Sequence, residues 1–584
     1  MGEYILPLAP RFSERINKNE LSNNAAWILA AFFAGFSLGC DSSTTDVPPP
    51  STENAKKTAI QFTDVTQNAG LDQFVHETGA VGDRWFPEAM GAGCGFIDYN
   101  GDGWQDILLV GGGRWEPRAD SPVPALWLYR NDKNGAFSLV TEEAGLGGIE
   151  AYGFGVTCAD YDNDGDEDFY FTVLGPDMLF RNDDGVFTEV GEKAGVDGGE
   201  LWSSSAMFFD ADNDGWLDLY AGTYVDWSPA TDLFCTLDGK TKSYCTPELY
   251  KGLPGRFYRN NGDGTFSDQT EQAGFLPSPG KTLGMVAFDY NRDGWIDVAV
   301  ANDTQRDLLF ENNGDGTFAE KGAMSGLAYD ENGRARAGMG IDAGVVDESG
   351  EETVFVGHFS KEMIGVFRYA GNGFFAERAA VSKIGRPSLL TLTFGLFLFD
   401  VDLDGDLDLF AANGHVQEDI EVTQDGISYR EPPHIFVNDG DGQFRDLGME
   451  IGGVFAKNLV GRGAAYADYD NDGVLDILVT ENGGPAHLWC NDSETGNNFL
   501  RISLRGEGGN RDALGARVVV KTGEQKMERM TRTGSSFLSN FEKTHTFGLG
   551  AASKADSVSI FWPDGHVQHL TDLPGGQTHL IERK

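Results

Sequence analysis

An acidic nine-residue segment recurs along the chain and limits most strongly how the chain can fold. It reads DYNGDGWQD at 98–106, and the pattern D-x-[DN]-x-D-G-x-x-D returns five more times. The six intact copies lie at 98–106, 160–168, 210–218, 289–297, 400–408 and 468–476, and a degenerate copy, IDAGVVDESG, begins near Asp342. The first aspartates are 50 to 79 residues apart. This spacing is typical of a four-stranded propeller blade.

A second element follows the acidic segments and consists of an apolar stretch, an Asn, a turn and a Phe. Examples are FYRNNGDGTF at 257–266 and LFENNGDGTF at 309–318. Asn-Gly and Asp-Gly pairs between apolar residues predict β-hairpins. A glycine-rich apolar stretch precedes each acidic segment, so one period contains four short strands. The sequence therefore predicts an all-β protein in which residues 59–496 form a seven-bladed β-propeller.

The two ends of this repeat region complement each other. Residues 60–71 (IQFTDVTQNAGL) have the pattern of a fourth strand without the first three, whereas the last blade, at about 461–490, lacks a fourth strand. Pairing the two segments would close the ring and remove its exposed edges. The repeat stops near Asn497, and residues 497–584 alternate apolar and polar residues between turns. We predict a small β-sandwich there.

The acidic segments have the chemistry of metal-binding loops. Side chains at positions 1, 3, 5 and 9 and the carbonyl at position 7 can surround one hard cation, and Gly at position 6 permits the sharp turn. Many carboxylates and few fixed waters favour Ca²⁺ over Mg²⁺. About six Ca²⁺ sites are expected; the alternative is a set of hydrogen-bonded turns without metal. The degenerate copy has Gly344 and Val346 at positions 3 and 5, so no metal is expected there. The candidate metal-site residues are Asp98, Asn100, Asp102, Trp104, Asp106, Asp160, Asp162, Asp164, Asp166, Asp168, Asp210, Asp212, Asp214, Trp216, Asp218, Asp289, Asn291, Asp293, Trp295, Asp297, Asp400, Asp402, Asp404, Asp406, Asp408, Asp468, Asp470, Asp472, Val474 and Asp476.

The charge balance excludes a general nucleic-acid binder and argues against attachment to anionic lipid by charge. The chain has 91 acidic and 44 basic side chains, for a net charge of −47. A general nucleic-acid binder needs a basic face, and attachment to anionic lipid by charge needs a basic patch. The loops account for about half of the excess. The other half fits either a solvated acidic surface or a composition adapted to salt.

The amino-terminal residues predict export. Residues 25–39 (AAWILAAFFAGFSLG) form an apolar stretch of signal-peptide length, and Cys40 follows them in a lipobox-like context. We expect 1–40 to be a signal peptide, with a lipid on Cys40, and 41–58 to be a disordered tether. The alternative is an ordinary cleaved or membrane-anchoring segment. Export places the protein in the cell envelope or at the cell surface, anchored to the membrane.

Cysteine and histidine residues add smaller predictions. Cys235 and Cys245 lie ten residues apart in the longest interval between acidic segments. In an exported protein this pair predicts a disulfide. Cys94 and Cys158 lie in apolar strands, where buried thiols are expected. His415, in NGHV, is expected to make structural hydrogen bonds; ligand binding is the alternative.

Several motifs carry a resemblance to known families. The acidic loops resemble the FG-GAP/VCBS repeats of integrin α-chain propellers. GNRDALGARV (509–518), GSSFLSN (534–540), FGLG (547–550) and WPDG (562–565) resemble the ASPIC/UnbV module. The combination, with PEAMGAGCGFIDYNGDG (87–103) and ANGHV (412–416), resembles the cartilage acidic protein family and its bacterial relatives. This resemblance implies a calcium-binding propeller of extracellular type and names no ligand.

Three functions fit these observations. The first is a non-enzymatic binding or adhesion module with an unknown protein or glycan ligand on a propeller face. The second is an accessory subunit of an envelope complex, which contacts its partner through 226–256 or the terminal module. The third is a calcium-dependent polysaccharide lyase or hydrolase. The acidic residues follow the repeat and form no additional cluster, so the sequence favours the non-enzymatic module.

Overall fold

The computed structural model describes residues 60–115, 123–236, 239–276 and 278–584, and these residues are almost entirely β-strand and loop. Seven four-stranded antiparallel sheets lie in the described residues before Asn497. Sheet 1 comprises β2 (Cys94–Ile97), β3 (Asp106–Val110), β4 (Leu126–Asn131) and β5 (Phe137–Leu139). Sheet 2 comprises β6 (Gly153–Ala159), β7 (Asp168–Val173), β8 (Met178–Asp183) and β9 (Val186–Glu189). Sheet 3 comprises β10 (Ser203–Phe209), β11 (Asp218–Thr223), β12 (Arg256–Asn260) and β13 (Phe266–Asp268). Sheets 4 and 5 comprise β14 (Thr282–Phe288), β15 (Asp297–Asn302), β16 (Leu308–Asn312), β17 (Phe318–Glu320); and β18 (Gly338–Val345), β19 (Glu352–His358), β20 (Gly365–Tyr369), β21 (Phe375–Glu377). Sheets 6 and 7 comprise β22 (Thr393–Phe399), β23 (Asp408–Asn413), β24 (His434–Asn438), β25 (Phe444–Asp446); and β26 (Gly461–Ala467), β27 (Asp476–Glu481), β28 (Ala486–Asn491), β1 (Phe62–Asp64).

The helices of the described residues are short turns between strands. None of them is long and apolar enough to cross a membrane. They are α1 (Gly191–Ala194), α2 (Gly322–Ser325), α3 (Ile420–Thr423), α4 (Gly448–Ile451) and the 3-10 turns η1 (Phe86–Ala89), η2 (Pro247–Leu249), η3 (Pro387–Leu390) and η4 (Gly453–Ala456).

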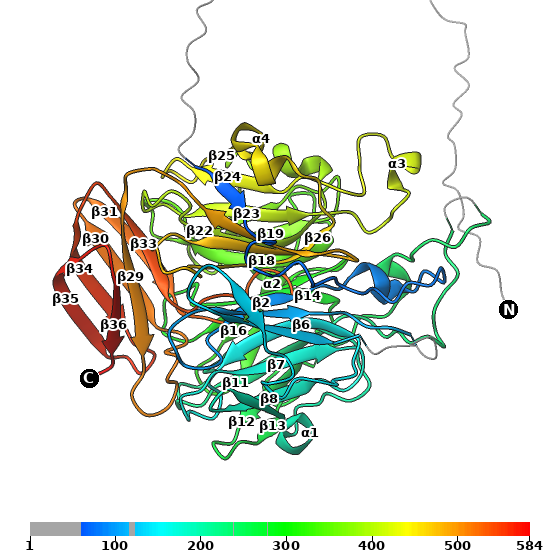
Figure 1. Cartoon of the computed structure of the whole chain (residues 1–584), viewed down its shortest axis with the longest axis horizontal. Helices are drawn as coiled ribbons and strands as arrows, with labels where there is room; N and C mark the ends of the chain where they lie inside the picture. Colours follow the sequence, from blue (N-terminus) through cyan, green and yellow to red (C-terminus); the bar gives the residue numbers. More distant parts are fainter. Residues whose placement is uncertain (1–59, 116–122, 237–238, 277) are drawn as a thin grey trace, which may run out of the picture. The chain divides into compact units, whose positions relative to one another are not determined.

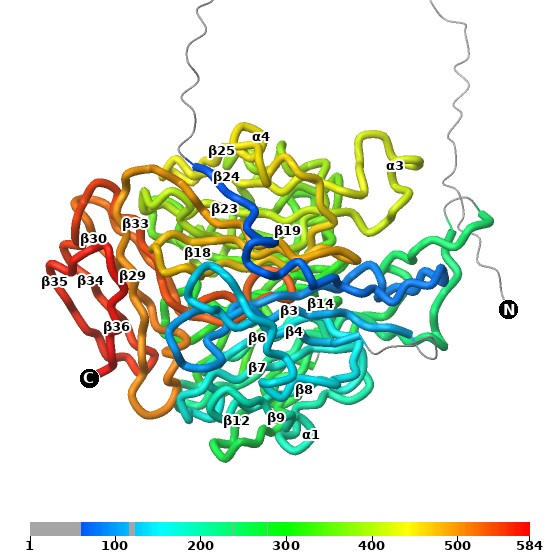
Figure 2. Tube along the Cα trace, viewed as in Figure 1, coloured from blue at the N-terminus to red at the C-terminus, as the bar shows by residue number. Residues whose placement is uncertain are grey.

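Figure 1 shows the sheets, and the contacts between their first strands close them into a ring. The first strand of each sheet contacts the first strand of the next, and β26 of sheet 7 contacts β2 of sheet 1. β1 supplies the fourth strand of sheet 7, with Thr63 opposite Cys490. Figure 2 shows the blue trace of β1 among segments from late in the chain. The predicted all-β propeller is confirmed, and β1 makes the pairing that the sequence predicts for residues 60–71.

The first strands are buried on both faces because each lies between two neighbouring sheets and near the ring axis. All seven residues of β6, for example, are buried. Small residues allow the close approach of these strands. A Cβ atom on Gly340 would lie 2.1 Å from the carbonyl oxygen of Phe394, and one on Gly93 would lie 2.4 Å from that of Phe154. Packing of this density explains the glycine-rich stretch before each acidic loop.

Two further sheets form the carboxyl-terminal module. The first contains β29 (Asn498–Arg505), β33 (His545–Gly550) and β36 (Thr578–Glu582); the second contains β30 (Arg517–Thr522), β31 (Gln525–Met530), β34 (Lys554–Phe561) and β35 (Val567–Pro574). Leu500 and Phe547 of the first sheet share one buried cluster with Val518 and Ile560 of the second. The module is therefore the predicted β-sandwich.

A segment of the terminal module enters the propeller ring. Residues 533–540, here called the finger, are all buried. Within the finger, β32 (Ser539–Asn540) pairs with β2 of sheet 1, and Ser536 exchanges backbone hydrogen bonds with Ile341 of sheet 5. Thr533 Oγ1 binds the backbone of Phe208 in sheet 3. The finger thus joins first strands from separate parts of the ring.

The side chain of Arg462, at the start of sheet 7, connects this sheet to segments beside sheets 1 and 6. Its side chain is fully buried, and it donates to the carbonyl oxygens of Ala89 at 2.8 Å and Gly414 at 2.9 Å. The guanidinium also lies over the ring of Phe394 at 4.0 Å. The motifs around 87–92 and 412–416 therefore supply carbonyl acceptors for a buried cation.

Candidate metal centres

The six intact acidic segments connect the first and second strands of sheets 1, 2, 3, 4, 6 and 7, and we number the loops accordingly. The aspartate at position 9 begins the second strand in every case, and all six of these aspartates are buried. They are Asp106, Asp168, Asp218, Asp297, Asp408 and Asp476. The repeated connection therefore places equivalent carboxylates at the same edge of the ring.

The first aspartate of each loop organises the turn. In loop 4, Asp289 Oδ1 accepts a hydrogen bond from the backbone N–H of Asp293, and its Oδ2 accepts one from that of Gly294, both at 3.0 Å. The bond from the glycine at position 6 recurs in all six loops. That glycine has a positive φ, which is +88° at Gly294. A side chain would strain the turn there.

Carboxylates converge in four of the loops. Oxygen atoms of three aspartates lie within 4.8 Å of one another in each of loops 2, 3, 6 and 7. The groups are Asp160, Asp162, Asp168; Asp210, Asp212, Asp214; Asp400, Asp402, Asp404; and Asp468, Asp470, Asp476. Loops 1 and 4 have Asn100 and Asn291 at position 3, so their third ligand would be an amide oxygen. Acidic groups of this kind are able to hold a metal ion.

Many carboxylate oxygens of the loops are buried and have no hydrogen-bond partner among the described residues. Burial of an unpaired carboxylate is costly unless a cation or donors compensate. Burial, together with the negative charges of neighbouring aspartates, raises the pKa of Asp106 and of Asp400 to about 8. A hard cation would remove both costs, so the donor set fits such an ion. The unpartnered atoms are Asp106 Oδ2, Asp160 Oδ1, Asp162 Oδ1, Asp212 Oδ1, Asp297 Oδ2, Asp400 Oδ1 and Asp402 Oδ1.

An asparagine on the third strand of six sheets clamps the loops, whereas its place before a turn in the sequence predicts only a hairpin. Its backbone N–H donates to the position-9 aspartate, as from Asn260 to Asp218 at 2.8 Å. Its side-chain amide donates to the carbonyl at position 8 of its own loop and to that at position 2 of the loop before it. Asn260 reaches Leu217 and Tyr161 in this way, both at 3.0 Å. The six residues are Asn131, Asn182, Asn260, Asn312, Asn438 and Asn491.

Sheet 5 departs from this pattern. Asp342 lies inside β18, so the predicted start of the degenerate loop near Asp342 was wrong. The connection runs from Val346 to Glu351 and is two residues shorter than in sheet 4, because β18 continues to Val345. Tyr369 occupies the place of the asparagine, with its ring 5.3 Å from that of Tyr290.

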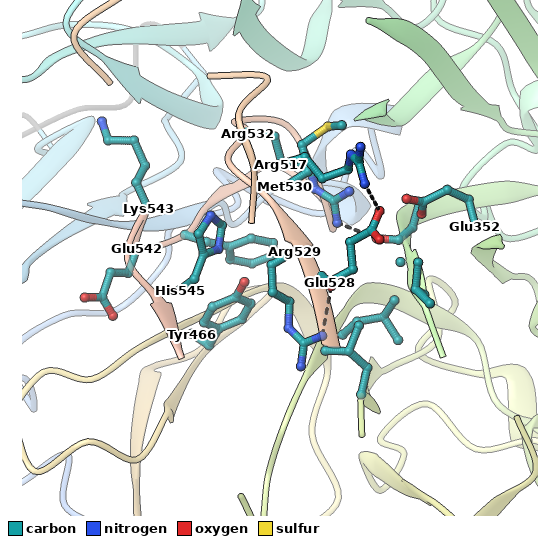
Figure 3. A pocket seen from close by; sticks show the side chains of 16 residues that line it. Glu352, Tyr466, Arg517, Glu528, Arg529, Met530, Arg532, Glu542, Lys543 and His545 are labelled. Atoms are coloured by element: carbon teal, nitrogen blue, oxygen red, sulfur yellow. Dashed lines mark hydrogen bonds and ion pairs between the residues drawn. The ribbon is translucent and has the colours of Figure 1, made fainter. Parts of the chain in front are cut away.

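Arginines of the terminal module lie against sheet 5. Arg532 donates to Asp342 Oδ1 at 2.5 Å and to the carbonyl of Ala343. Figure 3 shows this region, in which Arg517 and Arg532 lie with Glu528 near Glu352 of β19. Guanidinium groups therefore supply positive charge where the acidic loop is missing.

The terminal module also contacts the first aspartate of loops 2, 6 and 7. Arg501 lies 2.9 Å from Asp468 of loop 7, and both side chains are buried. The backbone N–H of Gly548 donates to Asp400 of loop 6 at 2.9 Å. Asp512 accepts from the backbone N–H of Asp160 in loop 2, also at 2.9 Å. The first aspartates of loops 2, 6 and 7 thus contribute both to the candidate metal sites and to the contact between modules.

The remaining candidates lie away from these loops. Cys235 and Cys245 form the predicted disulfide, while Cys94 and Cys158 are buried free thiols. Burial lowers the pKa of His415 to about 4, and its Nδ1 accepts from the backbone N–H of Gln417 at 3.0 Å. His415 therefore makes a structural hydrogen bond of the kind that the sequence predicts. Cys40 and the predicted tether lie outside the described residues.

Two protein-family models match the chain. The model described as "FG-GAP-like repeat" matches residues 98–171, 230–300, 289–344 and 412–479. The model described as "ASPIC and UnbV" matches residues 506–584. The first model begins at loop 1, and the second covers most of the terminal sandwich.

Curated relatives match about half of the chain. Cartilage acidic protein 1 of Xenopus tropicalis is 26% identical over 282 residues, covering 46% of this chain and 40% of that protein. The Homo sapiens protein is 25% identical over 301 residues, covering 49% and 41%. The matched region therefore spans about two fifths of the length of these relatives.

Two solved structures show more distant similarity. One is an Agrocybe aegerita lectin, described by its recognition of non-reducing terminal N-acetylglucosamine. Its TM-score is 0.37 at 18% identity, and the match covers 61% of this chain and 80% of the lectin. The exotype rhamnogalacturonan lyase YesX has a TM-score of 0.34 at 12% identity, covering 84% and 73%. Scores this low support no inference about function. The repeats, the terminal module and the curated relatives agree: the chain carries FG-GAP-like repeats and a carboxyl-terminal ASPIC and UnbV domain, and it is similar to cartilage acidic protein 1.

Proposed function

We propose that the chain is an exported calcium-binding module that presents a rigid, non-enzymatic binding surface. The proposal rests on the buried carboxylate oxygens of the acidic loops that have no hydrogen-bond partner in the part of the chain that the structure describes. One Ca²⁺ in each of the six intact loops would neutralise the oxygens that burial otherwise penalises. Ca²⁺ accepts six to eight oxygen ligands, which suits loops that offer several carboxylates and a carbonyl, whereas Mg²⁺ retains several waters.

Calcium would stabilise the surface and take no part in chemistry. Each loop is joined to its neighbour by an asparagine clamp, and loops 2, 6 and 7 contact the terminal module. An ion that orders one loop would therefore also order the adjoining loop and the contact between modules. The ligand would be a protein or a glycan bound to a face of the ring, with the chain held at the cell envelope through a lipid on Cys40.

The long connection between β11 and β12 favours a second candidate, an accessory subunit of an envelope complex. Leu233, Phe234 and Leu249 in this connection are 39%, 64% and 48% exposed. Apolar side chains grouped on one insertion are typical of contact surfaces between proteins. A complex that is lost when Phe234 is replaced by Ser, with calcium binding unchanged, would favour this second candidate.

The primary proposal is tested by thermal unfolding with calcium, magnesium or chelator. Calcium should raise the Tm strongly, because a site held at a hundred times its Kd adds about 2.7 kcal/mol. Asp289→Ala should reduce this shift. Asp315→Ala is the matched control, because Asp315 also stabilises a turn in sheet 4 but lies in the β16–β17 hairpin. A Tm that changes with neither calcium nor magnesium would show that the acidic loops do not bind these metals.

A further inference from the structure

A groove lies between sheets 5 and 6, outside the acidic loops. Its volume is about 350 Å³, which is within the range of small-molecule sites. Val346, Val366 and Phe444 form apolar parts of its wall, and each is at most 5% exposed. The groove thus has a buried apolar wall.

The groove lies where other sheet interfaces contain a tyrosine. At four interfaces, the tyrosine at position 2 of a loop packs against the first residue or the second residue of the next sheet's fourth strand. The ring pairs are Tyr99–Phe187 at 6.3 Å, Tyr161–Phe266 at 5.6 Å, Tyr290–Phe375 at 5.5 Å and Tyr469–Phe137 at 5.8 Å. Between sheets 5 and 6 the corresponding residues are Val346 and Phe444. A valine fills less of this space than a tyrosine.

Two other interfaces have small residues at this position but compensate with further rings. Opposite Ala211, Phe318 contacts the rings of Phe209, Phe257 and Phe275. On the side of Val401, Phe62 contacts Phe455 at 5.4 Å, and Phe455 in turn contacts the rings of Phe410 and Trp489. Phe444 has one such neighbour in the described residues, Phe355, on the opposite sheet at 5.8 Å. The missing aromatic side chain is therefore not replaced between sheets 5 and 6.

Polar groups give the groove a chemical preference. Thr353 is 1% exposed, lines the groove, and its hydroxyl has no hydrogen-bond partner in the described residues. Arg368 lies opposite Thr353 in the sheet and binds Asp347 at 2.7 Å. Arg378 also lines the groove; it is exposed, and no ion pair of its guanidinium occurs in the described residues. In a chain of net charge −47, a free guanidinium beside an apolar wall favours an anionic ligand.

We propose that this groove binds a small organic acid that carries a ring. The ring would lie against Val346, Val366 and Phe444, in the space that a tyrosine fills at the other interfaces. A hydroxyl on the ring would pair with Thr353, and the carboxylate would pair with Arg378. This site is separate from the acidic loops and does not depend on calcium chemistry.

The probe is 4-hydroxyphenylacetate, which combines the phenol ring of tyrosine with a carboxylate. Its binding to the full protein is measured by calorimetry or ligand-observed NMR in saturating calcium. Val346→Tyr should abolish binding, because the new side chain fills the groove, and should leave the Tm unchanged or higher. Arg378→Gln should weaken binding roughly tenfold, the value of one charge-assisted contact. Arg445→Gln, on an exposed arginine of β25 that pairs with Asp439, is the matched control and should bind as the parent does.

Two further measurements make the outcome decisive. 4-Methylphenol, which lacks the carboxylate, should bind the parent and the Arg378→Gln protein equally. If Val346→Tyr does not fold, Val346→Leu reduces the same space with a smaller side chain and should weaken binding in proportion. Absence of binding to the parent at millimolar probe would overturn the proposal, as would full binding to a folded Val346→Tyr protein.

Discussion

The side-chain amide of Asn260 donates to the backbone carbonyl of Tyr161 at 3.0 Å, so a residue of sheet 3 holds the acidic loop of sheet 2. The same amide donates to Leu217 in its own loop, also at 3.0 Å. One side chain therefore connects two candidate metal sites that are separated by 50 residues in the chain. Five other asparagines repeat this contact around the ring.

Asn260→Ala should weaken two loops at once. Loss of the amide leaves two carbonyl oxygens without their donor, which costs about 1–3 kcal/mol when the groups are buried. Urea unfolding should show this loss, and calcium titration should show lower affinity at loops 2 and 3. Asn261→Ala is the control: Asn261 is exposed, and its amide binds Thr265 within its own hairpin. Equal losses of stability and calcium affinity in the two variants would contradict the clamping role of Asn260.

The metal-free protein should lose stability as the pH rises. Burial raises the pKa of Asp400 to about 8 and that of Asp160 to about 7, above the unfolded value of about 3.9. The folded state then binds protons more tightly, so this contribution to stability is full below pH 4 and is lost as the pH rises to about 8. In chelator, the Tm should fall between pH 5 and 8.

Calcium should remove this pH dependence, because the ion replaces the protons as the balancing charge. Calcium affinity should increase over the same interval, since proton competition decreases. A Tm in chelator that stays level or rises from pH 5 to 8 would show that the loop carboxylates are balanced in another way.

Arg501→Met should separate the terminal module from loop 7. Arg501 is 3% exposed and pairs with the buried Asp468 and Glu542. Removal of one member of a buried ion pair costs about 3–5 kcal/mol, because the remaining carboxylates are left unpaired. Hydrogen exchange should increase in β29 and β33. Arg505→Met provides the comparison, because Arg505 and its partner Glu582 are both more than half exposed, and it should change stability by less than about 1 kcal/mol.

Reduction of the Cys235–Cys245 bond should loosen the connection between β11 and β12. A closed loop of this size contributes about 2–3 kcal/mol in the entropy model. The Cys235→Ser and Cys245→Ser double variant should be cut faster by protease within 226–256, with calcium binding at the loops unchanged. A parallel loss of calcium binding would mean that this connection supports the ring itself.

The propeller was predictable because its signals are local and repeated. The spacing of the acidic segments identified the sheets, and the unmatched segment at 60–71 identified the closing strand. The start of the degenerate loop of sheet 5 was predicted wrongly, because it was assigned from the position of Asp342. In the structure Val345 pairs with Glu352, so the register of this sheet is set by the hairpin and not by Asp342.

Contacts between distant segments had no such signal. The finger pairs Ser539 with Cys94, and Arg462 binds the carbonyl of Ala89. Backbone acceptors carry no sequence pattern of their own, so the roles of GSSFLSN and of Arg462 became visible only in three dimensions. The asparagine clamps gave a partial signal, because an asparagine recurs before each hairpin of the repeat except in sheet 5.

The most direct test of the account is the number of calcium ions bound per chain. Equilibrium dialysis in millimolar calcium, followed by metal analysis, should give a value close to six, one for each intact loop. Asp400→Asn together with Asp402→Asn should lower the value by about one. A protein that binds no calcium above background, or that binds the same amount after this double substitution, would contradict the assignment of the loops as metal centres.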